Sequence, residues 1–335
     1  MKDLKFSILI PTYKGAAVVG DTLKSILSQS FSNYEIIISE DASGDNIKEV
    51  VHSFNDSRIK FFQNEKNLGY PGNLEAARQR ATGDIIYLMG QDDILAEDSL
   101  ADTYNAFESD EDIGVVTRPY FWFHDDIHKA VRAKVQLNPK QDEVVSMSDD
   151  YSRIITLFHT LDQLSGLAYR AKYFDIPFHP DIFPCHVYPF ASIFKNHKAT
   201  FLKDHRIAVR IETSQARFLS SIYDKSPVQT WVTLFESVFS GDKYRDFRKH
   251  MIENFVAKNY IGTVQIKNFG KYKYVFREIA LLIKYRWKNF FNPMFWVISF
   301  GCVFIPATWL IRMVDWYKEN IESKKLPDIE FKYKL

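Results

Sequence analysis

The chain has 335 residues, enough for one large domain or for one domain with an appendage. Hydrophobic residues make up 46% of it and aromatic residues 16%, which allows a sizeable core and excludes wholesale disorder. The 43 Lys and Arg nearly balance the 42 Asp and Glu, which argues against a dedicated nucleic-acid-binding protein, so we expect no nucleic-acid partner.

Cysteine usage and the N-terminus both indicate a reducing compartment. Cys185 and Cys302 lie far apart without a CxxC pairing, which excludes a disulfide framework and a thiolate zinc site. The N-terminal MKDLKFSILIP contains an apolar run of only about six residues, too short for a secretory signal peptide. We therefore expect the protein to start in the cytoplasm.

Up to about residue 120, short apolar segments alternate with segments of helical periodicity. Apolar residues three or four apart predict helices, and the apolar runs between them predict strands that are buried on both faces. This alternation implies an α/β fold with a mostly parallel, Rossmann-like sheet, whose ligands bind beyond the carboxyl ends of the strands. The predicted strands are 6–11, 34–39, 59–64, 84–89 and 113–119, and the predicted helices are 18–30, 46–54, 72–81 and 96–107.

Strand-like segments recur at 166–170 and 199–212, and beyond about residue 215 the periodicity becomes helical. We therefore divide the chain into an α/β domain, residues 1–214, and a C-terminal helical region, residues 215–335.

The stretch 289–311 in the helical region carries no charge, and it follows a basic segment, 267–288, with seven Lys or Arg against one Glu. It fits a bilayer span, a buried core helix, or a segment that lies in or dips into one leaflet. Pro293, Gly301 and Pro306 interrupt it, which weakens a clean span. Because Trp296, Trp309 and Trp316, with the basic residues before 289, suit an interfacial location, we favour peripheral or monotopic attachment to the cytoplasmic face of the cell membrane.

Polar residues follow three of the predicted strands. The turn PTYKG, 11–15, follows the first strand, Glu40 and Asp41 end the second, and Asp92 and Asp93 follow the fourth. Paired carboxylates suit a divalent ion that completes its shell with phosphate oxygens and water. The sequence has no P-loop, GxGxxG turn or His-rich cluster, which removes the commoner phosphate and zinc sites. Two acids at this point also fit a solvated turn that caps a helix.

These segments resemble the family 2 glycosyltransferases with the GT-A fold. The resemblance rests on SILIPTYKG, SQSFSNYEIIISEDASGD and NEKNLGYPGNLEAARQRATGDIIYLMGQDDIL, and more faintly on LSGLAYRAKYF. It covers roughly residues 5–100 strongly and 160–205 weakly, and several ordered motifs make it more specific than an isolated pair of aspartates.

The resemblance implies a site for a pyrimidine nucleotide-sugar linked to UDP, TDP or CDP. Asp41 matches the aspartate that hydrogen-bonds the base, and Pro11, Thr12 and Tyr13 match the turn that wraps the base and the ribose. Asn67, in NLGYPGN, is a further candidate for the nucleotide-sugar, although this segment also fits a turn before a helix.

The resemblance also implies a bound Mn²⁺ or Mg²⁺. Asp92 matches an aspartate on the ribose and metal-water side, and Asp93 matches the direct metal ligand. The ion would hold the diphosphate and stabilise its charge as the sugar leaves. Gly90 stands where many members have the first aspartate of a D-x-D-D motif.

The catalytic base departs from the family pattern. Members usually carry a Glu-Asp pair ahead of the strand that matches ATFL, and no such pair occurs between residues 165 and 200. His186 occupies the matching position and histidine can act as a base, and Asp181 is the alternative. A lone histidine also fits a structural role.

We therefore predict an enzyme that moves a single sugar to a hydroxyl of a glycan, with a lipid-linked glycan of surface polysaccharide or O-antigen synthesis as the acceptor. The resemblance implies an inverting single displacement. SQARF, 214–218, lacks the Q-x-x-R-W motif of processive synthases, which predicts one sugar per encounter. Two alternatives stay open: a sugar-phosphate nucleotidyltransferase, and a degenerate member that binds nucleotide or glycan without turnover.

Overall fold

The computed structural model describes residues 3–212, 220–326 and 329–334. Its contacts divide the chain into two compact units. The first comprises Met1–Pro180, Cys185–Ile211 and Leu326–Leu335, and the second comprises Asp181–Pro184 and Glu212–Lys325. The division drawn from the sequence, at residue 214, differs at residues 181–184, at Glu212, which belongs with the second unit, and at the C-terminus, where residues 329–334 belong with the first unit. The segment SQARF, 214–218, lies outside the described residues.

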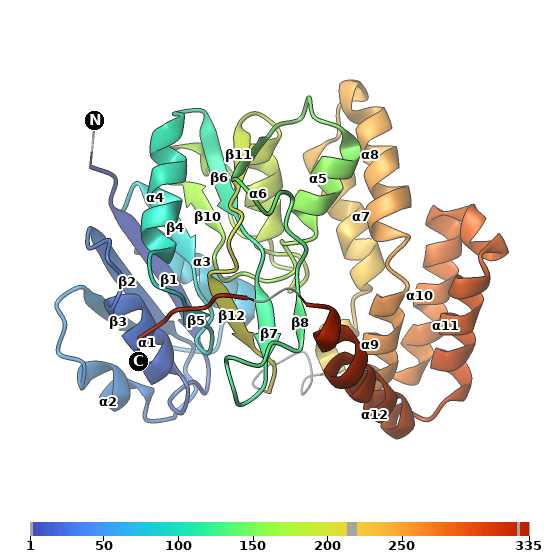
Figure 1. The fold of residues 1–335 in the computed structure, drawn as a ribbon, viewed down its shortest axis with the longest axis horizontal. Coiled ribbons are helices and arrows are strands. Elements are labelled where there is room, and N and C mark those ends of the chain that lie inside the picture. The colour runs from blue at the N-terminus through green and yellow to red at the C-terminus, as the bar shows by residue number, and fades with distance from the viewer. Residues whose placement is uncertain (1–2, 213–219, 327–328, 335) are drawn as a thin grey trace. The chain divides into compact units, whose positions relative to one another are not determined.

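The first unit is built on an eight-stranded sheet in the order β3-β2-β1-β4-β10-β6-β11-β9. Figure 1 shows β1, β2 and β4 side by side in it. Each strand predicted up to residue 119 is present and most of their apolar side chains are buried, so the α/β class is confirmed. The strands of the sheet are β1 Phe6–Thr12, β2 Tyr34–Glu40, β3 Ile59–Gln63, β4 Ile85–Leu88, β6 Ile113–Thr117, β9 Glu143–Val145, β10 Ala168–Arg170 and β11 Lys198–Phe201.

The register of the central strands brings the predicted site residues to one edge. β1 pairs in parallel with β2, with Thr12 opposite Glu40, and with β4, with Leu9 opposite Leu88. The turn after Thr12, the segment after Glu40 and the acidic loop after β4 therefore leave the sheet at the same carboxyl edge. β10 runs antiparallel between β4 and β6, which the sequence pattern did not indicate.

A second, four-stranded sheet in the order β5-β12-β7-β8 extends the acidic loop. Its strands are β5 Ile94–Leu95, β7 Phe121–Phe123, β8 Arg132–Ala133 and β12 Ile207–Arg210. The segment 199–212, which we predicted as one strand-like stretch, forms β11 in the first sheet and β12 in the second. Because β5 follows the two aspartates directly and pairs with β12, the end of β12 is held beside them.

The helices of the first unit bury their apolar faces in the core: Val19, Leu23 and Ile26 of α1 have no exposed surface. The four helices predicted before residue 110 are all present. The helices are α1 Val19–Leu27, α2 Ile47–His52, α3 Gly69–Gln79, α4 Ser99–Ser109, α5 Tyr151–Phe158 and α6 Val187–Phe194.

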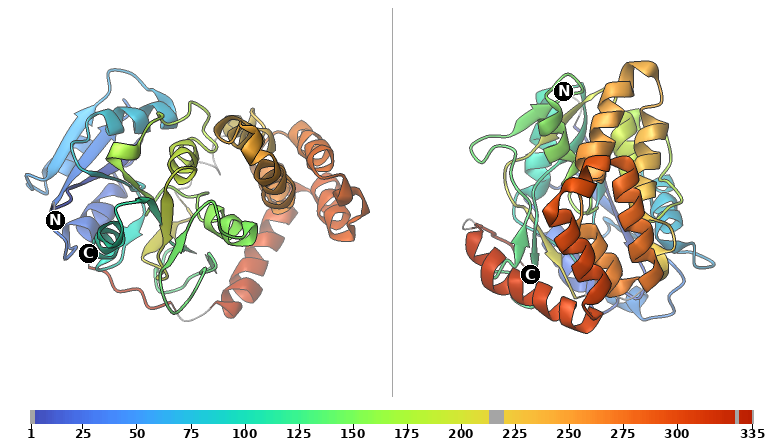
Figure 2. Two further views of the ribbon diagram at one scale, coloured as in Figure 1. Left: turned by 90° about the horizontal axis from the view of Figure 1, so that it is seen from above. Right: turned by 90° about the vertical axis from the view of Figure 1, so that its right-hand side faces the viewer.

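The second unit is helical, and Figure 2 shows α9, α10 and α11 packed side by side. Its helices are α7 Pro227–Val238, α8 Arg245–Met251, α9 Ile261–Phe269, α10 Tyr272–Tyr285, α11 Pro293–Phe304 and α12 Ala307–Tyr317. The uncharged stretch 289–311 is divided between α11 and α12, because Pro306 lacks the N–H that would continue α11. Among the described residues no helix is both long enough and apolar enough to cross a bilayer.

Candidate active site

Asp41 lies at the carboxyl end of β2, is buried, and is tied to the end of β1 by a hydrogen bond from its backbone N–H to the Thr12 carbonyl (3.0 Å). Its carboxylate Oδ1 accepts hydrogen bonds from Asn64 Nδ2 (3.0 Å) and from the Leu68 backbone N–H (2.8 Å). Among the described residues, Oδ2 receives no hydrogen bond, so this oxygen is available to accept one from a ligand.

Buried amides that the sequence reasoning missed hold these two strand ends in place. Asn73 Nδ2 donates to the Ser39 carbonyl (2.8 Å) and to the Thr12 carbonyl (3.3 Å). Asn64 Nδ2 also donates to Asn73 Oδ1 (2.9 Å), which links this pair to Asp41. Asn73 lies in the NLGYPGN segment, so the motif was visible, but only the fold reveals which of its residues faces the strand ends.

Asn67 acts in a local turn. Its Nδ2 donates to the backbone carbonyl of Asp41 (3.2 Å), and its Oδ1 accepts from the Gly69 N–H (3.0 Å), where α3 begins. Both bonds are those of a residue that shapes the loop before a helix. The role of Asn67 in contacting a nucleotide-sugar stays a prediction.

Gln91 fastens the acidic loop to the turn after β1. Its side-chain Oε1 accepts from the Tyr13 N–H (2.9 Å) and its Nε2 donates to the Tyr13 carbonyl (3.2 Å). Thr22 Oγ1 contacts the Gln91 and Asp93 carbonyls, each at 2.9 Å. The Tyr13 turn and the aspartate pair are thus a connected structure, and sequence reasoning did not single out Gln91.

Asp93 is almost fully buried, and each of its contacts is a donor. Ser165 Oγ (2.5 Å) and Gln163 Nε2 (3.0 Å) donate to Oδ2, and the Arg210 backbone N–H (3.2 Å) donates to Oδ1. Burial raises the pKa of the Asp93 carboxyl well above its usual range, and the neighbouring charge of Asp92 raises it further. The hydrogen bond from Ser165 lowers this pKa, but by less than burial raises it. The negative charge of Asp93 is therefore not balanced by the groups around it.

The carboxylates of Asp92 and Asp93 converge beside Gly90. A Cβ on residue 90 would lie 2.7 Å from Asp93 Oδ2 and 3.3 Å from Asp92 Oδ1. The first of these distances is a collision, so a side chain at position 90 would displace the carboxylate.

The donor set fits a hard divalent ion. Two carboxylate oxygens face the same small space, and the surroundings destabilise the charge of at least one of them. Within residues 3–212, 220–326 and 329–334, no group of three or more His, Cys, Asp or Glu is placed to hold a metal ion. An ion here would therefore take two protein carboxylates and rely on phosphate oxygens and water for its other ligands, as Mg²⁺ and similar ions commonly do.

Arg210 provides a positive charge close to Asp93, although no Lys or Arg is adjacent to the two aspartates in the sequence. Its guanidinium lies over the Phe123 ring (4.9 Å), and its Nη2 is 3.7 Å from an Asp21 carboxylate oxygen. Its charge lowers the pKa of Asp93, against the larger effect of burial. Arg210 Nε is buried and has no hydrogen-bond partner among the described residues. Because Arg210 follows Asp93 by more than a hundred residues, only the pairing of β12 with β5 reveals this neighbour.

His186 is buried at the start of α6. Its Nε2 lies 2.9 Å from the Leu161 carbonyl, which can only accept, so the ring proton is on Nε2. The lone pair on Nδ1 faces the Tyr70 hydroxyl at 3.4 Å. Burial lowers the pKa of His186 to about 4, so the ring is neutral at physiological pH.

Asp181, the other candidate base, belongs to the second unit, where it forms an ion pair with Lys225. The structure thus brings together Thr12, Tyr13 and the three aspartates at one edge of the sheet, and it places His186 in the same unit. Both candidate bases stay predictions.

Comparison with known proteins identifies the domain that carries this edge. Residues 7–159 match the family described as Glycosyl transferase family 2. The chain carries a family 2 glycosyltransferase domain. The matched range contains the Tyr13 turn, Asp41 and the two paired aspartates, whereas His186 and Asp181 lie beyond it.

Curated relatives share this glycosyltransferase domain. The UDP-Glc:alpha-D-GlcNAc-diphosphoundecaprenol beta-1,3-glucosyltransferase of Escherichia coli is 35% identical over 94 residues, 28% of this chain and 37% of the relative. The abequosyltransferase of Salmonella typhimurium is 35% identical over 117 residues, 33% of this chain and 35% of the relative. The matched segments thus span little more than a third of the length of these two relatives.

Solved structures share the fold. Residues 1–349 of TarS from S. aureus, in complex with UDP-GlcNAc, superpose with a TM-score of 0.68 over 96% of this chain and 89% of that chain, at 16% identity. A mannosyltransferase from Pyrobaculum calidifontis, in complex with GDP-Man and Mn²⁺, superposes with a TM-score of 0.56 over 97% of this chain and 88% of that chain, at 14% identity. The predicted GT-A fold of the glycosyltransferase domain is confirmed.

Proposed function

We propose that this protein is a glycosyltransferase that moves one sugar from a pyrimidine nucleotide-sugar to a hydroxyl of a lipid-linked glycan during surface polysaccharide synthesis. The observation that carries the proposal is the convergence of the β1, β2 and β4 ends. There Thr12, Asp41 and the pair Asp92 and Asp93 share one edge, inside the stretch that matches the family. The match also favours sugar transfer over nucleotidyl transfer.

The nucleotide would bind between Asp41 and the turn of Pro11, Thr12 and Tyr13. The available Oδ2 of Asp41 can accept a hydrogen bond from the ring N–H of uracil or thymine. Burial of Asp41 makes that bond selective, because a base that offers no donor there would leave Oδ2 of the carboxylate without a partner. Support for a uridine nucleotide comes from TarS, whose structure contains UDP-GlcNAc.

We expect Gln91→Ala to weaken UDP binding about tenfold while leaving the fold intact. The substitution removes both hydrogen bonds that hold the Tyr13 backbone, each of which contributes about 1 kcal/mol, so the turn would have to be ordered by the ligand itself. Calorimetric titration with UDP in the presence of Mn²⁺ measures the change. The matched control is Gln79→Ala, an exposed glutamine on α3, which should bind UDP as the wild type does. Equal affinities for the two variants would refute the role of Gln91.

Asp92 and Asp93 would hold Mn²⁺ or Mg²⁺ against the donor diphosphate. When bound, the ion supplies Lewis-acid stabilisation of the charge that builds up on the leaving diphosphate. The Mn²⁺ in the related mannosyltransferase structure supports this assignment. Arg210 is suitably placed to contribute a fixed positive charge at the same site.

Transfer would be an inverting single displacement. A base removes the proton of the acceptor hydroxyl as its oxygen bonds to the anomeric carbon, and the bond between that carbon and the diphosphate oxygen breaks. The base takes up the proton, and the nucleoside diphosphate leaves with the bonding electron pair. His186 and Asp181 remain the two candidates for the base.

The acceptor is inferred from the relatives. One is named for a diphosphoundecaprenol-linked substrate, and another for its abequosyl transfer. If the acceptor glycan is carried on a polyprenyl lipid, that lipid would hold it at the cytoplasmic face of the membrane, where the enzyme would act.

A thermal-shift panel of nucleotide-sugars, with and without Mn²⁺, tests the proposal. A ligand at a hundredfold excess over its Kd stabilises the folded state by about 2.7 kcal/mol, which corresponds to a rise in Tm of about 4 °C for a chain of 335 residues. We expect UDP- and TDP-linked sugars to produce this rise only with Mn²⁺, CDP-linked sugars, whose base has no ring N–H to donate to Asp41, to produce a smaller one, and GDP-mannose to produce none. A panel without any response to pyrimidine nucleotides would overturn the proposed function. A response without transfer to a lipid-linked acceptor would indicate a non-catalytic binding protein.

A further inference from the structure

The second unit exposes one apolar face of α11. Met294, Val297, Phe300 and Phe304 are between 54% and 75% exposed, and their spacing of three or four residues places them on one side of the helix. Phe295, Ser299 and Cys302 follow the same spacing on the opposite side and are buried. α11 is therefore apolar on both sides, and within the described residues only one side is covered. A helix of this composition is stable in water only if something else covers the second side.

Aromatic side chains extend this face into a continuous surface. The rings of Trp287, Phe291, Phe290, Trp296, Phe300 and Phe304 contact one another in that order, with centroid separations of 5.4 to 6.1 Å. Three of them, Phe291, Trp287 and Phe304, are at least 65% exposed. We call these six residues, together with Met294 and Val297, the aromatic face. Contiguous exposed apolar surface of this extent marks an interaction site.

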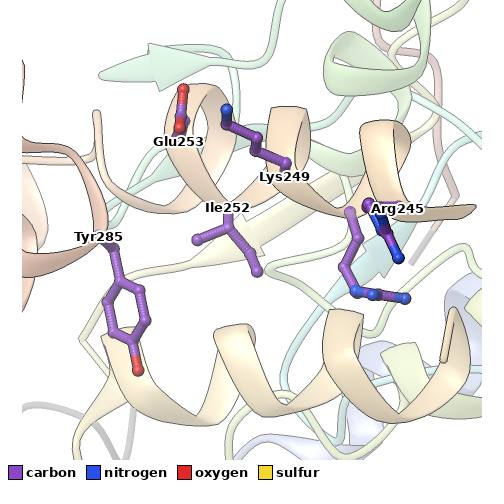
Figure 3. Close-up of a pocket in the computed structure, with 6 residues that line it drawn as sticks. Arg245, Lys249, Ile252, Glu253 and Tyr285 are labelled. Carbon is purple, nitrogen blue, oxygen red and sulfur yellow. The ribbon is translucent and has the colours of Figure 1, made fainter. Parts of the chain in front are cut away.

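The charge of the unit indicates what covers the aromatic face. Residues 220–326 carry 17 Lys and Arg against 9 Asp and Glu, a net charge of +8, whereas the whole chain has a net charge of +1. The exposed Lys284 and Lys288 stand on either side of Trp287, the first residue of the face. Three of the 17 cations gather around a pocket of about 270 Å³ in the same unit, which is lined by Arg245, Arg248, Lys249, Ile252, Glu253 and Tyr285 (Figure 3).

We propose that the aromatic face inserts into the interfacial region of an anionic lipid bilayer, with the adjacent lysines bound to lipid phosphates. Tryptophan and phenylalanine beside lysine are the composition that favours the boundary between headgroups and acyl chains. Each Lys or Arg near an anionic surface contributes attraction there. A second copy of the chain fits less well, because pairing the same faces would bring two strongly positive units together.

The attachment is interfacial and does not span the bilayer. α11 has 12 residues, so it is about 18 Å long, against a hydrocarbon core of about 30 Å. The chain then turns at Pro306 into α12, whose Trp309, Met313 and Trp316 are also exposed at helical spacing. This inference deepens the proposed function by naming the surface that presents the acceptor, and its test measures binding, so its failure is distinguishable from the absence of transfer.

Flotation of the full chain with vesicles tests the proposal. The variant Val297→Gln/Phe300→Gln/Phe304→Gln makes three exposed positions polar while keeping good helix-forming residues. We expect it to lower the partition coefficient onto phosphatidylcholine vesicles with 30% phosphatidylglycerol at least tenfold. The matched control is Val135→Gln/Val144→Gln, two exposed valines of the first unit, which should bind as the wild type does.

Charge is tested separately with Lys284→Gln/Lys288→Gln, against Lys48→Gln/Lys140→Gln in the first unit. The first pair should weaken binding to anionic vesicles about tenfold and remove part of its salt dependence, and the second pair should not. Wild-type protein that fails to float with anionic vesicles overturns the proposal. A triple variant that binds vesicles as the wild type does also overturns it. So does a wild type that binds no vesicles and forms a dimer, where the triple variant is a monomer.

Discussion

Replacement of Asp93 by Asn is expected to reduce sugar transfer by more than about a hundredfold and to leave the Tm at or above that of the wild type. Burial raises the pKa of Asp93, so ionising this carboxyl in the folded protein opposes folding at neutral pH. Asparagine has nearly the same shape and no charge. It therefore relieves the fold and removes the negative charge with which a divalent ion and its diphosphate would be held.

The groups around Asp93 can accommodate the amide. The Ser165 hydroxyl, which donates to the carboxylate, can rotate and accept from the amide NH₂. The amide oxygen can still accept from the Arg210 backbone N–H. The bond from Gln163 Nε2 is lost, because an amide NH₂ in place of Oδ2 cannot accept it. Since the bonds with Ser165 and Arg210 can be re-formed, a loss of transfer in a variant whose Tm is maintained reports the charge of Asp93 and not the collapse of its surroundings.

Thermal melting separates the two effects. Mn²⁺ together with UDP should raise the Tm of the wild type and leave that of the Asp93→Asn variant unchanged. Asp246→Asn, an exposed aspartate of the second unit, makes the same chemical change and should retain both transfer and the response to Mn²⁺. Unaltered turnover in the Asp93→Asn variant would exclude a metal-binding role for Asp93.

The features that were predictable from the sequence are those set by neighbouring residues. The β1, β2 and β4 strands are apolar runs that end in polar motifs, so both the parallel sheet and the positions of Asp41, Asp92 and Asp93 at its edge followed from the pattern. The break at Pro306 was also visible, because proline cannot continue a helix. Here the local sequence and the fold agree, as expected where short-range forces decide the structure.

The residues that complete the site come from remote parts of the chain. Ser165 and Gln163 reach Asp93 from the loop before β10, which enters the sheet antiparallel between β4 and β6. Arg210 reaches it through a second sheet. Neither pairing has a periodicity signal, since strands of three or four residues are too short to show the direction of their neighbours. Sequence reasoning therefore located the acidic edge and could not locate its hydrogen-bond partners.

His186 should make the protein sensitive to acid. Its pKa is lowered to about 4 in the folded state, from about 6.5 in the unfolded chain, so between these values the unfolded state binds more protons. The stability linked to His186 is therefore fully present above pH 6.5 and is lost as the pH falls toward 4. The groups that face the ring are the Leu161 carbonyl, the Tyr70 hydroxyl and the Cys185 thiol, while the charge of Asp162 partly opposes the shift.

Between pH 7 and pH 5 we expect the free energy of unfolding of the wild type to fall by about 2 kcal/mol more than that of the His186→Gln variant. Glutamine can donate to the Leu161 carbonyl and accept from Tyr70, and it does not titrate. Urea unfolding of both proteins at the two pH values measures the difference. The contributions of His159 and His205, whose pKa values are also lowered, are the same in both proteins and cancel. Equal pH dependence in the two proteins would show that His186 is not held neutral by burial.

The same variants decide whether His186 also acts on the acceptor. If its Nδ1 removes the acceptor proton, His186→Gln and His186→Ala should each lower kcat at least tenfold, and the acid limb of the wild-type kcat profile should lie near pH 4. Asp181→Ala, which breaks the ion pair with Lys225, should then leave kcat within about twofold. The reverse outcome assigns the base to Asp181. If both variants retain wild-type kcat, the proton is taken by another group, and a purely structural His186 would still show the acid sensitivity without any change in kcat.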